Sequence, residues 1–154
     1  MSTAVMEHTG AAAPVAGVAS SWRTNPVAQA FWLLRIGFTV APIVFGLDKF
    51  AHVLVNWDRY LAPQFARVLP GTTHELMYIV GVIEIAAGIL VAAVPRLGAF
   101  VVSAWLMGIV VNLLLPPGFY DIALRDFGLS LAACALGLLA KQYGRPLWKA
   151  FRVS

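Results

Sequence analysis

The sequence predicts an all-α integral membrane protein: a four-helix bundle with both termini in the cytoplasm and a short amphipathic helix at the outer interface, between helices 1 and 2. Three observations lead to this prediction. Apolar residues make up 60% of the 154 residues and charged residues only 12%, against about 25% charged residues in soluble domains. Four apolar segments approach the roughly 20 residues that cross the hydrocarbon core of a bilayer. Most basic residues in the short flanks lie on one side of these segments.

Composition divides the chain into three parts. Residues 1–25 are rich in small and polar residues and lack the basic start of a signal peptide, which predicts a disordered cytoplasmic tail. Residues 26–140 form the expected transmembrane domain. Residues 141–154 form a basic cytoplasmic tail, in which the stretch GRPLWKAFR is typical of an amphipathic anchor on a lipid surface.

Proline and glycine set the boundaries of the four expected helices. These helices should occupy residues 28–54, 75–94, 97–115 and 121–140. Only Pro95-Arg96 separates the second helix from the third, so these two must form an antiparallel hairpin. Pro116-Pro117-Gly118 ends the third helix, because proline removes an amide donor and glycine permits a reversal.

The distribution of basic residues predicts the orientation in the membrane. Six of them fall on the side of the two termini: Arg23, Arg96, Lys141, Arg145, Lys149 and Arg152. The opposite loops carry two, Arg59 and Arg67, so the positive-inside rule places both termini in the cytoplasm. Arg35 lies one to two turns inside the first helix and is expected to snorkel to the cytoplasmic surface.

The segment between the first two helices, NWDRYLAPQFARVLP, has its own helical pattern. Apolar residues recur at helical spacing, with charged and amide residues between them, and Pro63 falls in the middle. This pattern predicts a short amphipathic helix in the outer interface, broken near Pro63. It fits either a lipid-surface anchor or a lid over a pocket.

Polar residues interrupt the expected helices at matching depths. The candidate site consists of Asp48, Lys49, His52, Glu84, Asn112, Arg125 and Asp126. Successive helices run in opposite directions and rise about 1.5 Å per residue, so all of these positions fall in the outer half of one bundle. Asp48 and His52 are four residues apart and should share a helix face.

The cost of placing charges in a bilayer predicts how these groups pair. Lys49 should face Glu84 or Asp126, and Arg125 should face Glu84 or Asp48. If all of these groups ionise, Lys49 and Arg125 carry two positive charges, and the carboxylates Asp48, Glu84 and Asp126 carry three negative charges. The set is then one proton short of neutral. Such a set fits a ligand or proton site, and it equally fits static ion pairs that fix the register of the helices.

Small residues indicate where helices pack closely. Gly46 leaves room for a neighbouring helix beside the polar residues of the first helix. Three small-xxx-small spacings, which begin at Gly37, Ala104 and Ala133, are typical of close helix contacts in membranes.

Several classes of function are excluded by what the sequence lacks. It contains no GxSxG, HExxH, P-loop or GxGxxG motif. The single cysteine, Cys134, excludes an internal disulfide and a CxxC redox pair. His8, His52 and His74 are too scattered for a metal or haem site. We expect no metal, no covalently bound cofactor and no nucleic-acid partner.

The stretches FGLDKF, GVIEIAAGILVAAVPRLGAFV and YDIALRDFGLSLAACALGLL, in this order, resemble the DoxX family over about residues 30–140. The most specific part of the resemblance is the combination of Gly46, Lys49, Glu84, Gly88, Arg96, Arg125 and Asp126. The resemblance implies a four-helix protein of the bacterial inner membrane that associates with redox complexes. The family takes its name from a membrane subunit of a thiosulfate:quinone oxidoreductase.

Three hypotheses of function follow. The first is a quinone-contacting membrane subunit of a redox complex, in which Glu84, His52 and Asp126 exchange protons and Lys49 and Arg125 donate hydrogen bonds. The second is a non-catalytic scaffold or assembly factor with a purely structural polar core. The third is a small proton-coupled transporter. The expected partners are the lipid bilayer, other membrane or redox proteins, and a second copy of the chain.

Overall fold

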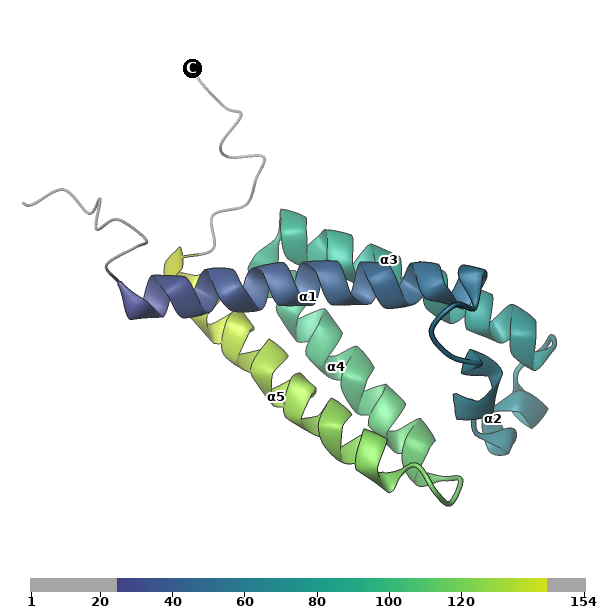
Figure 1. Ribbon diagram of the computed structural model, residues 1–154. Coiled ribbons are helices and arrows are strands. Elements are labelled where there is room, and N and C mark those ends of the chain that lie inside the picture. The colour runs from purple at the N-terminus through teal and green to yellow at the C-terminus, as the bar shows by residue number, and fades with distance from the viewer. Residues whose placement is uncertain (1–24, 144–154) are drawn as a thin grey trace, which may run out of the picture.

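The computed structural model describes residues 25–143, and both predicted tails lie almost entirely outside this range. The described chain is all-helical, with four long helices and two short ones between the first and second long helices (Figure 1). The elements are α1 (Pro26–Ala51), the 3₁₀ helix η1 (Trp57–Tyr60), α2 (Pro63–Val68), α3 (Thr73–Ala93), α4 (Pro95–Leu114) and α5 (Tyr120–Tyr143).

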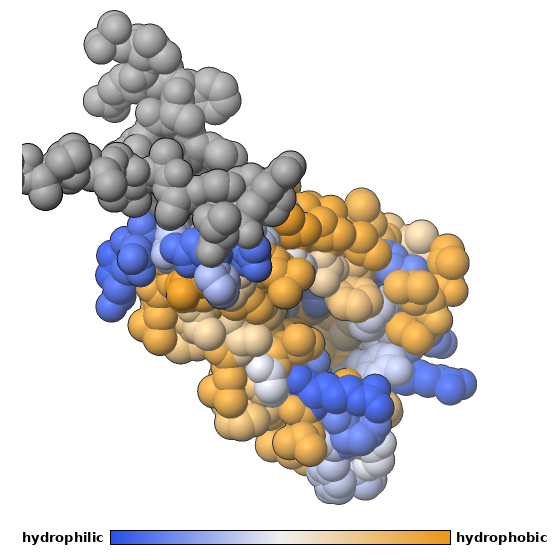
Figure 2. Space-filling model, turned by 60° about the vertical axis from the view of Figure 1, so that its left-hand side comes forward, coloured by the Kyte–Doolittle hydropathy of each residue, from blue (hydrophilic) through white to orange (hydrophobic). Residues whose placement is uncertain are grey.

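The four long helices support the prediction of a multi-pass membrane protein. Each of α1, α3, α4 and α5 is long and apolar enough to cross a bilayer. Their bounds agree with the predicted ones within three residues, and α5 continues past the predicted end at residue 140 to Tyr143. Apolar residues cover most of the face shown in Figure 2, as expected for helices that contact lipid.

Local sequence signals explain where the helices begin and end. The side chain of Asn25 accepts hydrogen bonds from two backbone amides of the first turn of α1, and Pro26 occupies the first helical position. Helix α1 ends because His52 adopts a left-handed conformation, with φ of 53°. Thr72 and Glu75 form a reciprocal capping box at the start of α3.

The bundle has the shape of a V. Helix α1 packs chiefly on α3, and α4 packs chiefly on α5. The two pairs meet at the end where Val94 joins α3 to α4, and they diverge toward the opposite end (Figure 1). We call the segment of residues 52–72, which contains η1 and α2, the connector. It lies at the wide end of the V, which we call the connector end (Figure 1).

Glycines hold α1 against α3. A Cβ atom at Gly46 would lie only 2.6 Å from the carbonyl oxygen of Gly81, and one at Gly81 would lie 2.8 Å from the carbonyl oxygen of Gly46. A Cβ atom at Gly88 would lie 2.7 Å from the carbonyl oxygen of Thr39. The prediction that Gly46 permits close approach is therefore confirmed.

The small-residue spacings give a mixed result. Gly137 is in close contact, because the ring of Phe100 would lie 2.9 Å from a Cβ atom there. The prediction is wrong for Gly37 and Gly108, where a Cβ atom would meet nothing within 4 Å. These two glycines lie where the V is open, so they line empty space instead of a helix contact.

The narrow end of the V is a packed core. Phe31, Val91 and Leu136, from three different helices, are fully buried there. Arg35 is buried beside them, and its Nη2 donates a hydrogen bond of 2.6 Å to the carbonyl oxygen of Ala92 in the last turn of α3. Arg35 therefore satisfies a free carbonyl at a helix end, instead of snorkelling to the surface as the sequence predicted.

The connector has the helical break that the sequence predicted. Its two short helices are separated by Leu61 and Ala62, and Pro63 begins the second. The side chain of Asn112 in α4 anchors this break, since it accepts a hydrogen bond from the amide of Ala62 (2.9 Å) and donates one to the carbonyl oxygen of Tyr60 (2.6 Å). The connector is thus fastened to the far arm of the V.

Candidate ligand-binding cleft

Two adjoining cavities occupy the opening of the V. The larger, of about 610 Å³, lies under the connector and is lined in part by charged and polar side chains; we call it the polar chamber. The smaller, of about 360 Å³, lies toward the narrow end between α1 and the α4–α5 pair, and we call it the apolar chamber. The chambers adjoin at residues that line both: Phe45, Glu84, Trp105, Leu106, Ile109 and Leu129.

A buried ion pair lies where the chambers meet. Lys49 Nζ in α1 donates a hydrogen bond of 2.6 Å to Glu84 Oε2 in α3, and the two side chains are only 4% and 12% exposed. Of the two partners predicted for Lys49, Glu84 and Asp126, the structure pairs it with Glu84. Pairing is necessary here, because an unpaired charge inside a bundle at membrane depth carries a large desolvation penalty.

Trp57 of the connector covers this lysine. The ammonium group of Lys49 lies 3.8 Å from the centre of the Trp57 ring, within the range of a cation–π interaction. The indole N–H of Trp57 in turn donates a hydrogen bond of 2.7 Å to Asp48 Oδ2. The connector therefore places an aromatic ring, held by a hydrogen bond to Asp48, over the ammonium group of Lys49 in the wall of the polar chamber.

Asp48 accepts hydrogen bonds from the connector and does not line either chamber. Its Oδ1 accepts hydrogen bonds from the backbone amides of Val53 (3.1 Å) and Leu54 (3.0 Å), and its Oδ2 accepts the one from Trp57. These three donors come from the connector and engage both carboxylate oxygens. Asp48 therefore positions the ring over Lys49, although the sequence placed it in the candidate site itself.

His52 also lies outside the chambers. Since α1 ends at Ala51, the expectation that His52 shares a helix face with Asp48 is wrong. Its ring stacks on the ring of His74, with the centroids 4.9 Å apart, at the exposed surface of the connector end. The assignment of His52 as a proton donor for a ligand in the cleft therefore has no support in the geometry.

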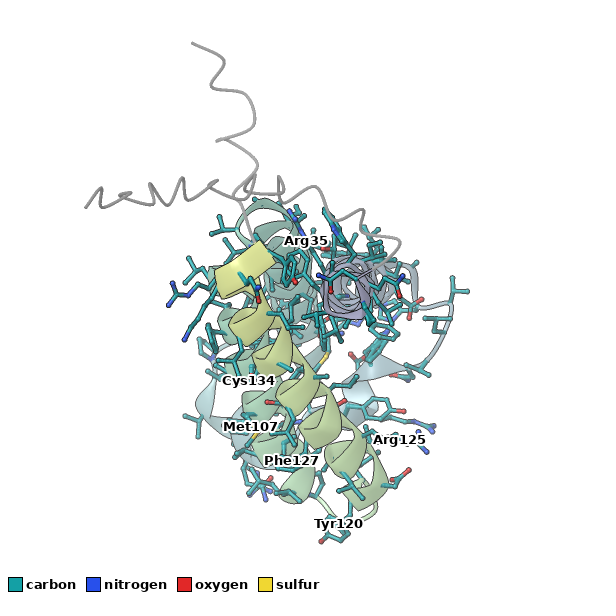
Figure 3. All side chains as sticks on the ribbon, turned by 90° about the vertical axis from the view of Figure 1, so that its left-hand side faces the viewer. Arg35, Met107, Tyr120, Arg125, Phe127 and Cys134 are labelled. Atoms are coloured by element: carbon teal, nitrogen blue, oxygen red, sulfur yellow. The ribbon has the colours of Figure 1, made fainter. Side chains whose placement is uncertain are left out.

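Arg125 and Asp126 lie on the α5 wall of the polar chamber. Arg125 pairs with Asp121 at 3.6 Å, one turn earlier on the same helix, and its side chain is 74% exposed. The prediction that Arg125 faces Glu84 or Asp48 is therefore wrong, because a neighbouring carboxylate satisfies it at the surface. Figure 3 shows Arg125 far from the buried Arg35.

Asp126 is the one carboxyl group of the predicted site that has no direct partner. It lies within electrostatic range of Lys49 and Glu84, but no hydrogen bond or ion pair to its carboxyl group occurs among residues 25–143. Lys49 and Glu84 are buried and Asp126 is half-buried. If all three groups ionise, this smaller set is one proton short of neutral, as the sequence predicted for the larger set.

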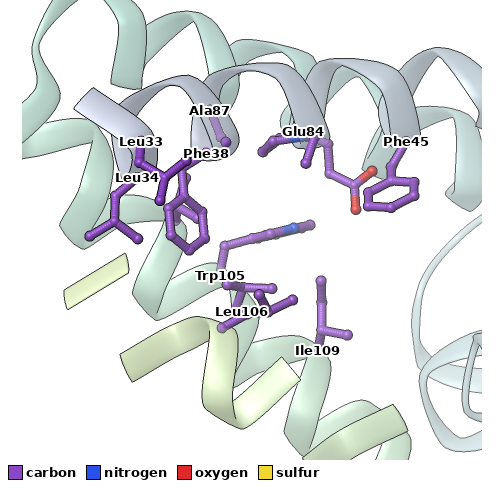
Figure 4. A pocket seen from close by; sticks show the side chains of 14 residues that line it. Leu33, Leu34, Phe38, Phe45, Glu84, Ala87, Trp105, Leu106 and Ile109 are labelled. Carbon is purple, nitrogen blue, oxygen red and sulfur yellow. The ribbon is translucent and has the colours of Figure 1, made fainter. Parts of the chain in front are cut away.

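Sequence reasoning missed Trp105 in α4, which lines both chambers. Figure 4 shows its ring reaching across the cleft below Glu84. The indole N–H lies close to the Glu84 carboxyl group, yet it is buried and makes no hydrogen bond of normal geometry. Buried donors are nearly always satisfied in proteins. The sequence signal was an indole N–H in a mostly apolar helix, which also fits ordinary core packing.

The apolar chamber thus leads from the narrow end of the V to the charged and hydrogen-bonding groups of the polar chamber. Among residues 25–143 there is no group of three or more side chains that could hold a metal ion. Comparisons of the chain with protein-family models, with curated proteins and with solved structures found no match.

Proposed function

We propose that the chain is a DoxX-like subunit of the bacterial inner membrane that holds a quinone in the cleft, as part of a redox complex. The observation that carries this proposal is the junction of the two chambers, where the apolar chamber ends at a buried lysine–carboxylate pair and at a buried indole N–H that makes no hydrogen bond of normal geometry among the described residues. In this proposal both termini lie in the cytoplasm, and the connector lies at the outer interface.

A quinone needs an apolar channel for its tail, hydrogen-bond donors for its carbonyl oxygens and a source of protons for its reduction. The apolar chamber fits the first need, since Glu84 is the only ionisable residue in its wall among residues 25–143. Lys49 and Trp105 supply donors at the junction. Glu84 and Asp126 share the excess negative charge, so this pair can take up a proton and release it when the ligand is reduced.

One observation favours a second candidate, a scaffold or assembly factor. Most polar groups predicted for the site already satisfy one another or the connector, as Lys49–Glu84, Asp48 and Asn112 do. Such a network also fits a polar core that only fixes the helix register. The third hypothesis, a proton-coupled transporter with Glu84 as the switching acid, has no specific observation that favours it.

The test is native purification in mild detergent, followed by lipid extraction and mass spectrometry of quinones and co-purifying proteins. We expect the wild type to retain quinone and Glu84→Gln to lose it while remaining folded. Asp121→Asn makes the same chemical change at a carboxyl group that is 65% exposed, and should retain quinone. A stoichiometric protein partner, with no quinone in any form, would favour the scaffold.

A further inference from the structure

The apolar chamber opens sideways between α1 and α5. Its wall on α1 includes Leu33, which is 75% exposed, and its wall on α5 includes Leu129, which is 47% exposed. Both residues belong to helices that are apolar enough to span a bilayer. The rim of the chamber is therefore part of the surface that contacts lipid, so an apolar chain can pass into it from the bilayer without crossing water.

Gly37 keeps the apolar chamber open as a slot along α1. It lines the apolar chamber, and a Cβ atom placed on it would meet nothing within 4 Å. The slot runs along α1 from Leu33 to Phe45, twelve residues apart, which corresponds to roughly 18 Å of helix. This length suits an extended hydrocarbon chain lying against α1.

Trp105 lies where this slot reaches the polar groups. It belongs to the walls of both chambers, and its buried N–H, which lies beside the Glu84 carboxyl group, makes no hydrogen bond of normal geometry among the described residues. In contrast, the other indole at the polar chamber, Trp57, donates to Asp48 and has no donor left for a ligand. A hydrogen-bond acceptor at the head of a bound chain would satisfy Trp105.

From these observations we infer that Trp105 donates a hydrogen bond to a carbonyl oxygen of the ligand's head group, while the ligand's tail lies over Gly37 in the apolar chamber between α1 and α5. This inference rests on the proposed function and adds the orientation of the ligand and its recognition residue. The head group faces the connector end, beside Lys49 and Glu84, and the tail points toward the narrow end of the V.

The test separates head-group recognition from tail binding. Two probes are titrated into the full-length protein in lipid nanodiscs: duroquinone, which has no tail, and decylubiquinone, which has a ten-carbon tail. Trp105→Phe removes the donor and keeps the ring, so it should weaken both probes by a similar factor, about three- to tenfold. Gly37→Leu fills the slot, so it should weaken decylubiquinone by about tenfold or more and leave duroquinone unchanged.

Matched controls distinguish these effects from general damage. Gly128→Leu places the same side chain on a helix glycine that also has open space around it but lines neither chamber. Trp32→Phe makes the same ring change at a tryptophan that is 44% exposed. Neither control should alter the affinity for either probe, and circular dichroism of each variant checks that the helices are retained.

The outcomes identify which proposal fails. If the wild type binds neither probe, the proposed quinone site is wrong and the inference falls with it. If the wild type binds both probes and Trp105→Phe binds them equally well, the recognition role of Trp105 is overturned while the quinone site stands. If Gly37→Leu and Gly128→Leu have the same effect on decylubiquinone, the assigned position of the tail is overturned.

Discussion

Replacement of Lys49 by methionine should strongly destabilise the bundle, because it leaves the Glu84 carboxylate buried without its partner. The two charged atoms lie 2.6 Å apart. At an effective dielectric constant of about 20, this separation corresponds to a gross Coulomb attraction of about 6 kcal/mol, most of which offsets desolvation. Loss of one partner of a buried pair typically costs about 3–5 kcal/mol. Alternative partners in unfolded membrane helices reduce such costs, so we expect about 3 kcal/mol.

The double replacement isolates the pair. Lys49→Met combined with Glu84→Met exchanges two buried charges for apolar side chains of similar length, and such exchanges are often neutral or stabilising. We therefore expect the double variant to be more stable than Lys49→Met alone. The destabilisation of the double variant should then be well below the sum of the two single effects, and this shortfall is the coupling energy of the pair.

The assay is reversible unfolding in mixed micelles with increasing denaturing detergent, followed by circular dichroism. Arg125→Met is the matched control, because the Arg125–Asp121 pair is exposed and longer, at 3.6 Å. It should change the free energy of unfolding by less than about 1 kcal/mol. The reasoning is refuted if Lys49→Met unfolds at the same concentration of denaturing detergent as the wild type, or if the effects of the two methionine replacements on the free energy of unfolding simply add.

Two further predictions concern the frame around the cleft. Gly46→Ala should lower the free energy of unfolding by about 1–3 kcal/mol, because its methyl group would overlap the α3 backbone. Gly128→Ala is the control, because Gly128 has open space around it, and this variant should not lose stability. Equal stability of the two variants in the same unfolding assay would contradict the glycine contact. Asp48→Ala should release the connector, because three hydrogen bonds from the connector to Asp48 are lost. Amide hydrogen exchange should become faster over residues 53–60, whereas the control Asp121→Ala should leave exchange there unchanged. Unchanged exchange in both variants would show that Asp48 does not fasten the connector.

The sequence predicted most of the fold because its signals are local. Apolar length, prolines and glycines specify four helices to within three residues. Residue counts also limited the partner of Lys49 to Glu84 or Asp126, because they give the depth of each side chain along antiparallel helices. The break of the connector at Pro63 follows from the properties of proline itself.

The rest depends on features that residue counts do not define. Arg125 was misplaced because the rotation of α5 about its axis, which turns this side chain to the surface, is fixed by packing against α4. Asp48 was misplaced because α1 ends at Ala51 and His52 turns the chain, so the connector folds back over Asp48 and donates hydrogen bonds to its carboxylate. Trp105 and the opening of the V were missed because the divergence of the two helix pairs arises from contacts distant in sequence.

The central claim is that the cleft holds a quinone at the Lys49–Glu84 pair. Its most direct test is the molar ratio of quinone to protein in detergent-purified samples, measured by mass spectrometry for the wild type and for folded Glu84→Gln. We predict a reproducible ratio approaching one quinone per chain in the wild type and a much lower ratio in the variant. Equal ratios in the two proteins, or no quinone in the wild type, would contradict the claim.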